Sequence, residues 1–323
     1  MSSPDPLLPH PGELNETPAA PQIAPPEVLP PQSHPQPAAA HSPSFFESYR
    51  QFYQPPRFPN FGDLGILLVL LISGWICAGI LVATALHFHL YGVSKITQAF
   101  NDIHYTLGSE AAWYLFSFLG CLIVFPAVWH IGFFRGIEWR GDAVLRTRAR
   151  LAAALLACIA LAAVDAILLP GPTQAPIDQI FREPGAAWLL FAFGITLAPF
   201  FEEMGFRGFL LPALCTAWDW SMEKIRRMPP AHVDEDGKAE WSLPAMIVGS
   251  VLTSLPFALM HAEQTGWSLG PFVLLLCVSL ILCWIRLSTR SLAASTVVHA
   301  CYNLLLFSLM LAGTDGFKHL DKI

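Results

Sequence analysis

Charged residues make up only 13% of this 323-residue chain, whereas about 25% is typical of soluble domains. Hydrophobic residues make up 54%, which favours a membrane protein over a soluble one. The net charge of −6 provides no excess of basic residues, so we expect no nucleic-acid partner.

Several motifs of hydrolases and metal sites are absent. No two of the seven cysteines form a CxxC pair, and all lie in or beside apolar runs, so we interpret them as small core residues. The absence of HExxH and GxGD argues against a zinc metalloprotease and a paired-aspartate protease. Without an internal repeat, a transporter built from duplicated halves receives no support.

The first 43 residues contain no lysine or arginine and 13 of the 28 prolines. This composition predicts a disordered, weakly acidic, proline-rich tail over residues 1–43. It lacks a basic segment followed by an apolar one, so we do not expect a signal peptide. Residues 44–61 are aromatic and interrupted by proline, which predicts a segment at the membrane interface.

Seven apolar runs follow, and most reach the roughly 20 residues that cross a bilayer core. We therefore predict an all-α, multi-pass membrane helix bundle of about seven transmembrane helices over residues 62–313, followed by a C-terminal tail at 314–323. The fifth and sixth runs are short and closely joined, so a re-entrant pair is an alternative. The expected spans are 63–88, 111–133, 150–169, 186–206, 244–261, 269–286 and 291–311.

Positive charge is distributed unevenly between the two sides of these spans. With the N-terminus in the cytoplasm, 14 of the 18 lysines and arginines fall on the inside. Cytoplasmic segments carry such an excess, so we predict a protein of the inner or plasma membrane with a cytoplasmic N-terminus.

Three charged residues, Glu202, Glu203 and Arg207, stand at the end of the fourth apolar run. A charge at bilayer depth costs roughly 2.5–3.5 kcal/mol on insertion scales, so these residues need a reason. On a helix, Glu203 and Arg207 are four residues apart in the favourable order for an ion pair. Glu202 is turned about 100° from Glu203, which leaves its carboxylate available as a general base.

Three further polar residues lie in later apolar runs: His261 closes the fifth, and His299 and Asn303 lie four residues apart in the seventh. We expect them to face the bundle interior together with Glu202. A glutamate and a histidine can hold and deprotonate a water, while a histidine N–H and an asparagine amide can stabilise an oxyanion. This set suits water-driven hydrolysis without a covalent nucleophile.

Each of these residues also has a plainer interpretation. A buried histidine is more often a hydrogen-bonded core residue than a catalyst, and an asparagine in a span often joins two helices. A zinc site made of Glu202, His261 and His299 is an alternative. No two of these ligands share a helix, so we favour metal-free chemistry and expect no cofactor.

The polar residues form three motifs that resemble those of the CPBP family of intramembrane proteases. This family includes the CAAX prenyl protease type 2 and bacteriocin-processing or immunity proteins, also called the Abi family. The resemblance covers residues 150–311 and rests on Glu202-Glu203-x-x-x-Arg207, Phe257-x-x-x-His261 and His299-x-x-x-Asn303, in that order on successive apolar helices.

The resemblance implies a glutamic-type endopeptidase of the membrane. It implies that Glu202 and His261 activate water and that His299 and Asn303 stabilise the oxyanion. The second glutamate and the arginine of the first motif have supporting roles. The partner would be a peptide or membrane-protein substrate in the lipid bilayer. Eukaryotic members cut the last three residues from prenylated CaaX proteins, so a lipidated substrate is compatible with the resemblance but not required by it.

Two other functions remain open from the sequence. A non-catalytic membrane immunity or binding protein of the same family would keep the polar pocket for recognition. A proton-coupled transporter is a weaker alternative, because buried glutamate and histidine also serve proton relays.

Overall fold

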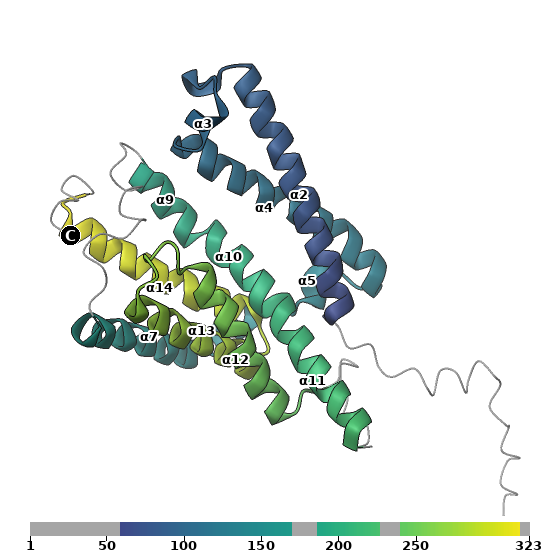
Figure 1. Cartoon of the computed structure of the whole chain (residues 1–323). Coiled ribbons are helices and arrows are strands. Elements are labelled where there is room, and N and C mark those ends of the chain that lie inside the picture. The colour runs from purple at the N-terminus through teal and green to yellow at the C-terminus, as the bar shows by residue number, and fades with distance from the viewer. Residues whose placement is uncertain (1–58, 170–185, 227–239, 317–323) are drawn as a thin grey trace, which may run out of the picture. The chain divides into compact units, whose positions relative to one another are not determined.

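The computed structural model describes residues 59–169, 186–226 and 240–316, and every regular element in these ranges is a helix (Figure 1). The all-α prediction is therefore confirmed. The long helices are α2 (Phe61–His87), α4 (Ile103–Trp129), α7 (Arg148–Leu168), α11 (Leu211–Arg226), α12 (Leu243–Met260), α13 (Leu269–Thr289) and α14 (Leu292–Gly313). The shorter helices are η1 (Leu90–Gly92), α3 (Ile96–Ala99), α5 (Phe133–Gly136), α6 (Gly141–Arg146), α9 (Ala186–Ile195), α10 (Leu197–Glu203) and η2 (Met204–Leu210).

Seven helical stretches of the described residues are long and apolar enough to cross a membrane, as the sequence predicts. The protein is thus a multi-pass membrane protein. The second stretch begins at Ile103 rather than at 111, because the Asp102 side chain caps it by accepting from the His104 and Tyr105 amides. The expected tail at 1–43 and most of the segments at 44–61 and 314–323 lie outside the described residues.

The fourth stretch differs most from its prediction. It continues from Ala186 to Arg226 over 41 residues, about twice what a bilayer core requires. The helical stretch therefore runs well beyond residue 206, where the fourth span was expected to end. The charged motif lies in the middle of this long helical stretch rather than at its end.

Helices α2 and α4 pack side by side (Figure 1). Gly74 of α2 approaches α4 so closely that an added Cβ would overlap the Ser117 hydroxyl, the kind of contact that small residues permit between membrane helices. The indole N–H of Trp113 donates a 2.8 Å hydrogen bond to the Leu71 carbonyl oxygen. These contacts fix the two helices as one unit.

Two buried clusters surround the charged motif. The first joins α2 and α4 to η2 and the start of α14; its members are Leu67, Cys121, Phe125, Trp129, Phe133, Ile137, Met204, Phe209 and Leu292. The second joins α7, α13 and α14; its members are Leu151, Ala154, Cys158, Val278, Leu282, Ile285, Ala294, Val298 and Tyr302. The packing of these clusters sets the positions of α13 and α14 beside the fourth stretch.

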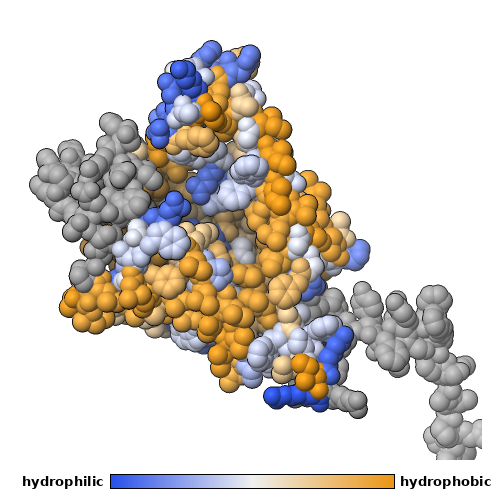
Figure 2. All heavy atoms as spheres, in the orientation of Figure 1, coloured by the Kyte–Doolittle hydropathy of each residue, from blue (hydrophilic) through white to orange (hydrophobic). Residues whose placement is uncertain are grey.

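The outer surface is apolar, as a lipid environment requires. Side chains such as Trp75 and Ile123 are 65% and 74% exposed. Figure 2 shows hydrophobic residues over most of the visible face, with hydrophilic ones gathered near α3 and near the end of α11. Exposed apolar surface of this extent would promote aggregation in water.

Candidate active site

The fourth stretch changes its winding around the charged motif. After α9 ends at Ile195, Thr196 has non-helical backbone angles (φ −122°, ψ −77°), and α10 then runs to Glu203. The next seven residues, η2, form a π-helix before α11 continues the stretch. Short π-helical insertions within α-helices occur frequently at functional sites. The irregular winding and the charged motif therefore indicate a functional site in the same part of the helical stretch.

Glu203 and Arg207 form the ion pair that their spacing predicts. Both side chains are fully buried, and Nη1 of Arg207 lies 2.8 Å from Oε1 of Glu203. Nη2 of Arg207 donates to Ser279 on α13, at 3.0 Å to its carbonyl oxygen and 2.7 Å to its hydroxyl oxygen. Arg207 thus connects the π-helix to α13. Removal of the Glu203 carboxylate would leave the buried Arg207 charge unpaired, which strongly destabilises a fold.

His299 enters the same network from α14. Its Nδ1 lies 3.1 Å from Oε1 of Glu203, the oxygen that also accepts from Arg207. An ionised carboxylate only accepts hydrogen bonds, so Nδ1 of His299 is the donor in this contact. The ring is therefore held with its other nitrogen, Nε2, free for chemistry.

His261 is held in an equivalent way by a backbone carbonyl. It caps the C-terminus of α12, and its Nδ1 lies 2.8 Å from the Phe257 carbonyl oxygen one turn earlier. Because a carbonyl oxygen only accepts, Nδ1 of His261 is again the donor. In both histidines, therefore, Nδ1 donates the hydrogen bond that orients the ring, and Nε2 faces Glu202.

Glu202 lies between these two Nε2 atoms. Its Oε2 is 3.8 Å from Nε2 of His261 and 3.7 Å from Nε2 of His299. This oxygen is buried and accepts no hydrogen bond from any residue that the structure describes. The separations are too long for direct hydrogen bonds, but one water could contact the oxygen and either nitrogen. The structure thus brings three of the four expected catalytic side chains together from three helices.

Asn303, the fourth expected residue, has a different contact. Its Nδ2 donates a 2.8 Å hydrogen bond to the Gly194 carbonyl oxygen, in the last turn of α9, where carbonyls lack a helical donor. An added Cβ at Gly194 would come within 2.7 Å of the Phe307 ring, so α9 and α14 approach closely here. The amide has a second N–H, which remains a candidate donor to an oxyanion.

The motif that ends at His261 begins at Phe257, whose ring lies among the charged groups. The Arg207 guanidinium carbon lies 4.5 Å from the ring centroid. The His261 and His299 ring centroids lie 4.9 Å and 5.8 Å from it. The spacing of four residues between Phe257 and His261 was the available signal, because such residues share a helix face.

A second buried arginine supports the π-helix, and no sequence pattern pointed to it. Nε of Arg286, on α13, donates a 3.2 Å hydrogen bond to the Arg207 carbonyl oxygen. Its Nη1 lies 2.8 Å from Oε2 of Glu138, whose own carbonyl oxygen accepts from the Leu292 N–H at the start of α14. These residues are far apart along the chain, so only the tertiary structure could associate them.

The described residues offer no ready group of metal ligands. Nowhere in these ranges do three or more His, Cys, Asp or Glu side chains converge in a way that could hold a metal ion. The zinc alternative for Glu202, His261 and His299 would therefore need these side chains to move together.

A family model matches part of the chain. Residues 184–305 match the family model described as type II CAAX prenyl endopeptidase, Rce1-like. The matched segment includes all three motifs, and the match confirms the resemblance to CAAX-type membrane proteases over that segment. No curated protein and no solved structure matches the chain.

Proposed function

We propose that this protein is an intramembrane endopeptidase that hydrolyses a peptide bond near the cytoplasmic membrane face. The observation that carries the proposal is the position of the Glu202 carboxylate between the Nε2 atoms of His261 and His299. The match to CAAX-type prenyl endopeptidases supports a membrane protease at the level of the family. Glutamate activates the water in this mechanism, and no covalent intermediate forms.

The hydrogen bonds of the two imidazoles determine how many protons the site needs. Both rings donate through Nδ1, so in the neutral form each Nε2 only accepts. A single water can donate only two hydrogen bonds, so it cannot donate to both Nε2 atoms and to an ionised Glu202 at the same time. We infer that one imidazole is an imidazolium in the active form. Two carboxylates, Arg207 and one imidazolium then leave the buried group electrically neutral.

His299 is the better carrier of this additional proton. A carboxylate, Glu203, lies 3.1 Å from its Nδ1, whereas His261 faces a neutral carbonyl oxygen. An imidazolium at His299 presents Nε2–H, the donor that an oxyanion requires. His261 keeps an accepting Nε2 and orients the water together with Glu202.

The reaction proceeds in two steps. Glu202 takes a proton from the water while the water oxygen bonds to the substrate carbonyl carbon. The electrons of the C=O double bond move to oxygen, and the resulting oxyanion accepts from Nε2–H of His299 and from the second amide hydrogen of Asn303. The carbon–nitrogen bond then breaks as Glu202 returns the proton to the leaving nitrogen. The products are a carboxylic acid and an amine, and Glu202 is ionised again.

The charge distribution supports a site close to the cytoplasm. With the N-terminus in the cytoplasm, as the charge distribution predicts, the fourth stretch enters the bilayer from the outer face near Ala186. Glu202 follows this residue by about 24 Å of helix, most of a hydrocarbon core of ~30 Å. The substrate would be a peptide or membrane-protein segment, and the family match makes a prenylated C-terminus the first to test.

The substitution Glu202→Gln tests the proposal, because glutamine keeps the size of the side chain but cannot take the proton. In cells that carry Glu202→Gln, proteomics of membrane-protein C-termini should find the cleaved ends at least about 100-fold less abundant than in wild-type cells. The matched control is Glu263→Gln, at an exposed glutamate just after α12, which should cleave normally. Full cleavage by the Glu202 variant would exclude this residue as the base. A binding or immunity protein, in contrast, would keep its cellular phenotype in Glu202→Ala.

A further inference from the structure

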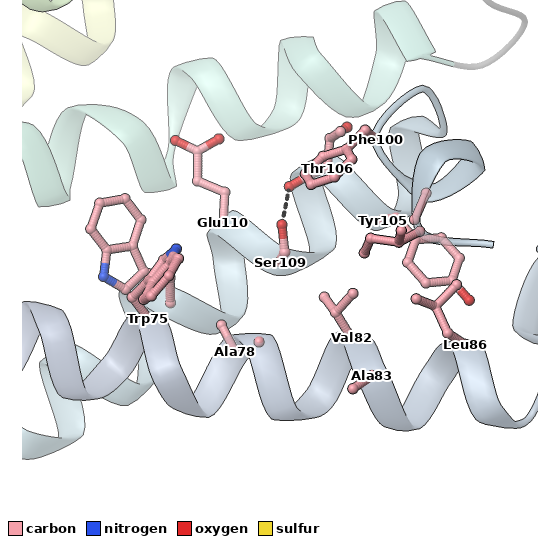
Figure 3. A pocket seen from close by; sticks show the side chains of 14 residues that line it. Trp75, Ala78, Val82, Ala83, Leu86, Phe100, Tyr105, Thr106, Ser109 and Glu110 are labelled. Atoms are coloured by element: carbon pink, nitrogen blue, oxygen red, sulfur yellow. Dashed lines mark hydrogen bonds between the residues drawn. The ribbon is translucent and has the colours of Figure 1, made fainter.

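A cavity separate from the three motifs lies between α2, α3 and α4. Its volume is about 540 Å³, within the roughly 300–1,000 Å³ of small-molecule sites. Figure 3 shows α2 along one side and α4 along the other. Most of its lining is hydrophobic, and four of the lining residues are aromatic: Trp75, Phe100, Tyr105 and Trp113.

One acidic residue, Glu110 of α4, lines this cavity. Figure 3 shows its side chain extending from α4 on the side away from α2. Its Oε1 accepts a 2.9 Å hydrogen bond from the Tyr114 hydroxyl. Among the ion pairs of the described residues, none involves Glu110. An ionisable side chain within a membrane span is costly and usually has a functional partner. Among the described residues, Glu110 has the Tyr114 hydroxyl as a donor but no cationic side chain.

The Glu110 end of the cavity adjoins the catalytic helix. The ring of Tyr114, which binds Glu110, stacks on Phe201 with centroids 4.6 Å apart, and Phe201 precedes Glu202. A ligand at Glu110 would therefore lie beside α10, with the rest of its length between α2 and α4. Trp75, which lines the cavity from α2, is 65% exposed, so this wall is accessible from outside the helix bundle.

We propose that this cavity binds a single-chain cationic amphiphile from the bilayer. The apolar chain lies among the hydrophobic and aromatic side chains, where its burial is favourable. The ammonium head pairs with the Glu110 carboxylate, because hydrogen bonds between two charged groups are about twice as strong as neutral ones. The aromatic walls add attraction for a cation. A fatty acid would place two carboxylates together, and a neutral alcohol would leave Glu110 without a counter-charge.

Photolabelling tests this site directly and does not depend on peptide cleavage. The full-length protein in lipid nanodiscs is labelled with a diazirine-bearing dodecylamine, and the labelled peptides are identified by mass spectrometry. Unlabelled dodecylamine, dodecanol and dodecanoate then compete for the site. We expect label on α2 and α4, and dodecylamine should compete at least about tenfold better than the other two.

Two comparisons test the carboxylate and the cavity space separately: Glu110→Gln against the wild type, and Gly79→Leu against Gly65→Leu. Glu110→Gln should weaken dodecylamine competition about tenfold and leave dodecanol unchanged. Gly79→Leu should abolish labelling, because Gly79 lines the cavity and an added Cβ there meets no atom within 4 Å, so the side chain fills space without a clash. Its matched control is Gly65→Leu, also on α2 with no atom within 4 Å of an added Cβ but outside the lining, which should label normally.

The outcomes that overturn the proposal are equally specific. Equal competition by dodecylamine and dodecanol, unchanged in Glu110→Gln, would mean that the carboxylate recognises no cation. Equal labelling of Gly79→Leu and Gly65→Leu would mean that the ligand does not occupy this cavity. Stronger competition by an apolar peptide with one lysine than by dodecylamine would make the occupant a peptide instead of an amphiphile.

Discussion

Nδ1 of His299 lies 3.1 Å from Oε1 of Glu203, and this contact gives the two adjacent glutamates different environments. Glu203 points into a fully buried network with Arg207 and His299. Oε2 of Glu202 lies nearby without a hydrogen-bond partner among the described residues. Neighbouring side chains on a helix point about 100° apart, so adjacent carboxylates can serve a structural role and a chemical one.

Loss of charge at the two glutamates should therefore affect stability to very different extents. Glu203→Gln leaves Arg207 buried without its carboxylate, so we expect a loss of about 3–5 kcal/mol in the free energy of unfolding. Glu202→Gln should lower it clearly less than Glu203→Gln does, because Oε2 of Glu202 accepts no hydrogen bond from the described residues, while abolishing cleavage. Unfolding in detergent micelles, followed by circular dichroism, measures both. Equal stability of the two variants would contradict this division of roles.

Asn303→Ala should affect rate more than stability. Loss of one interhelical hydrogen bond costs about 0.6–2 kcal/mol, whereas loss of one oxyanion donor lowers kcat about 100- to 1,000-fold. Gly194→Ala is the control. Its Cβ would push α9 away from the Phe307 ring, so it disturbs the same helix contact but keeps the Asn303 side-chain amide. If both variants lower kcat equally, Asn303 acts only by joining α9 to α14.

Arg286→Lys should show that Arg286 positions the π-helix. Lysine keeps the positive charge opposite Glu138, but it lacks the forked geometry that also reaches the Arg207 carbonyl oxygen. We expect kcat to fall about 10- to 100-fold through misplacement of the site. Arg286→Met, which also loses the charge, should be clearly less stable than Arg286→Lys. A purely structural role predicts that Arg286→Lys keeps the wild-type kcat once folded protein is compared.

Removal of metal ions should leave the proposed activity unchanged. No group of His, Cys, Asp and Glu in the described ranges is arranged to hold an ion, and the proposed water activation uses only Glu202 and His261. The initial rate of purified enzyme after treatment with a chelator, compared with untreated enzyme, is the measurement. A rate that falls and returns with added zinc would favour the zinc site of Glu202, His261 and His299.

Local sequence patterns were sufficient for one part of the site. The spacing of Glu203 and Arg207 predicted their ion pair, because residues four apart are neighbours on the surface of an α-helix. The cost of charge in lipid identified Glu202, His261 and His299 as inward-facing. Ser279, Arg286 and Glu138 carried no such signal. Serine side chains are ordinary in membrane helices, and the two charges lie near expected span ends, where they cost little.

The sequence by itself determined the helical fold, the seven apolar stretches and the polar residues that lipid could not solvate, because hydrophobicity and helical spacing are properties of the chain alone. Only the tertiary structure decided which nitrogen of each histidine faces Glu202, that Asn303 binds Gly194, and that Arg286 supports the π-helix. Those relationships depend on how α10, α12, α13 and α14 pack, and the distances between helices are not encoded in the periodicity of any single helix.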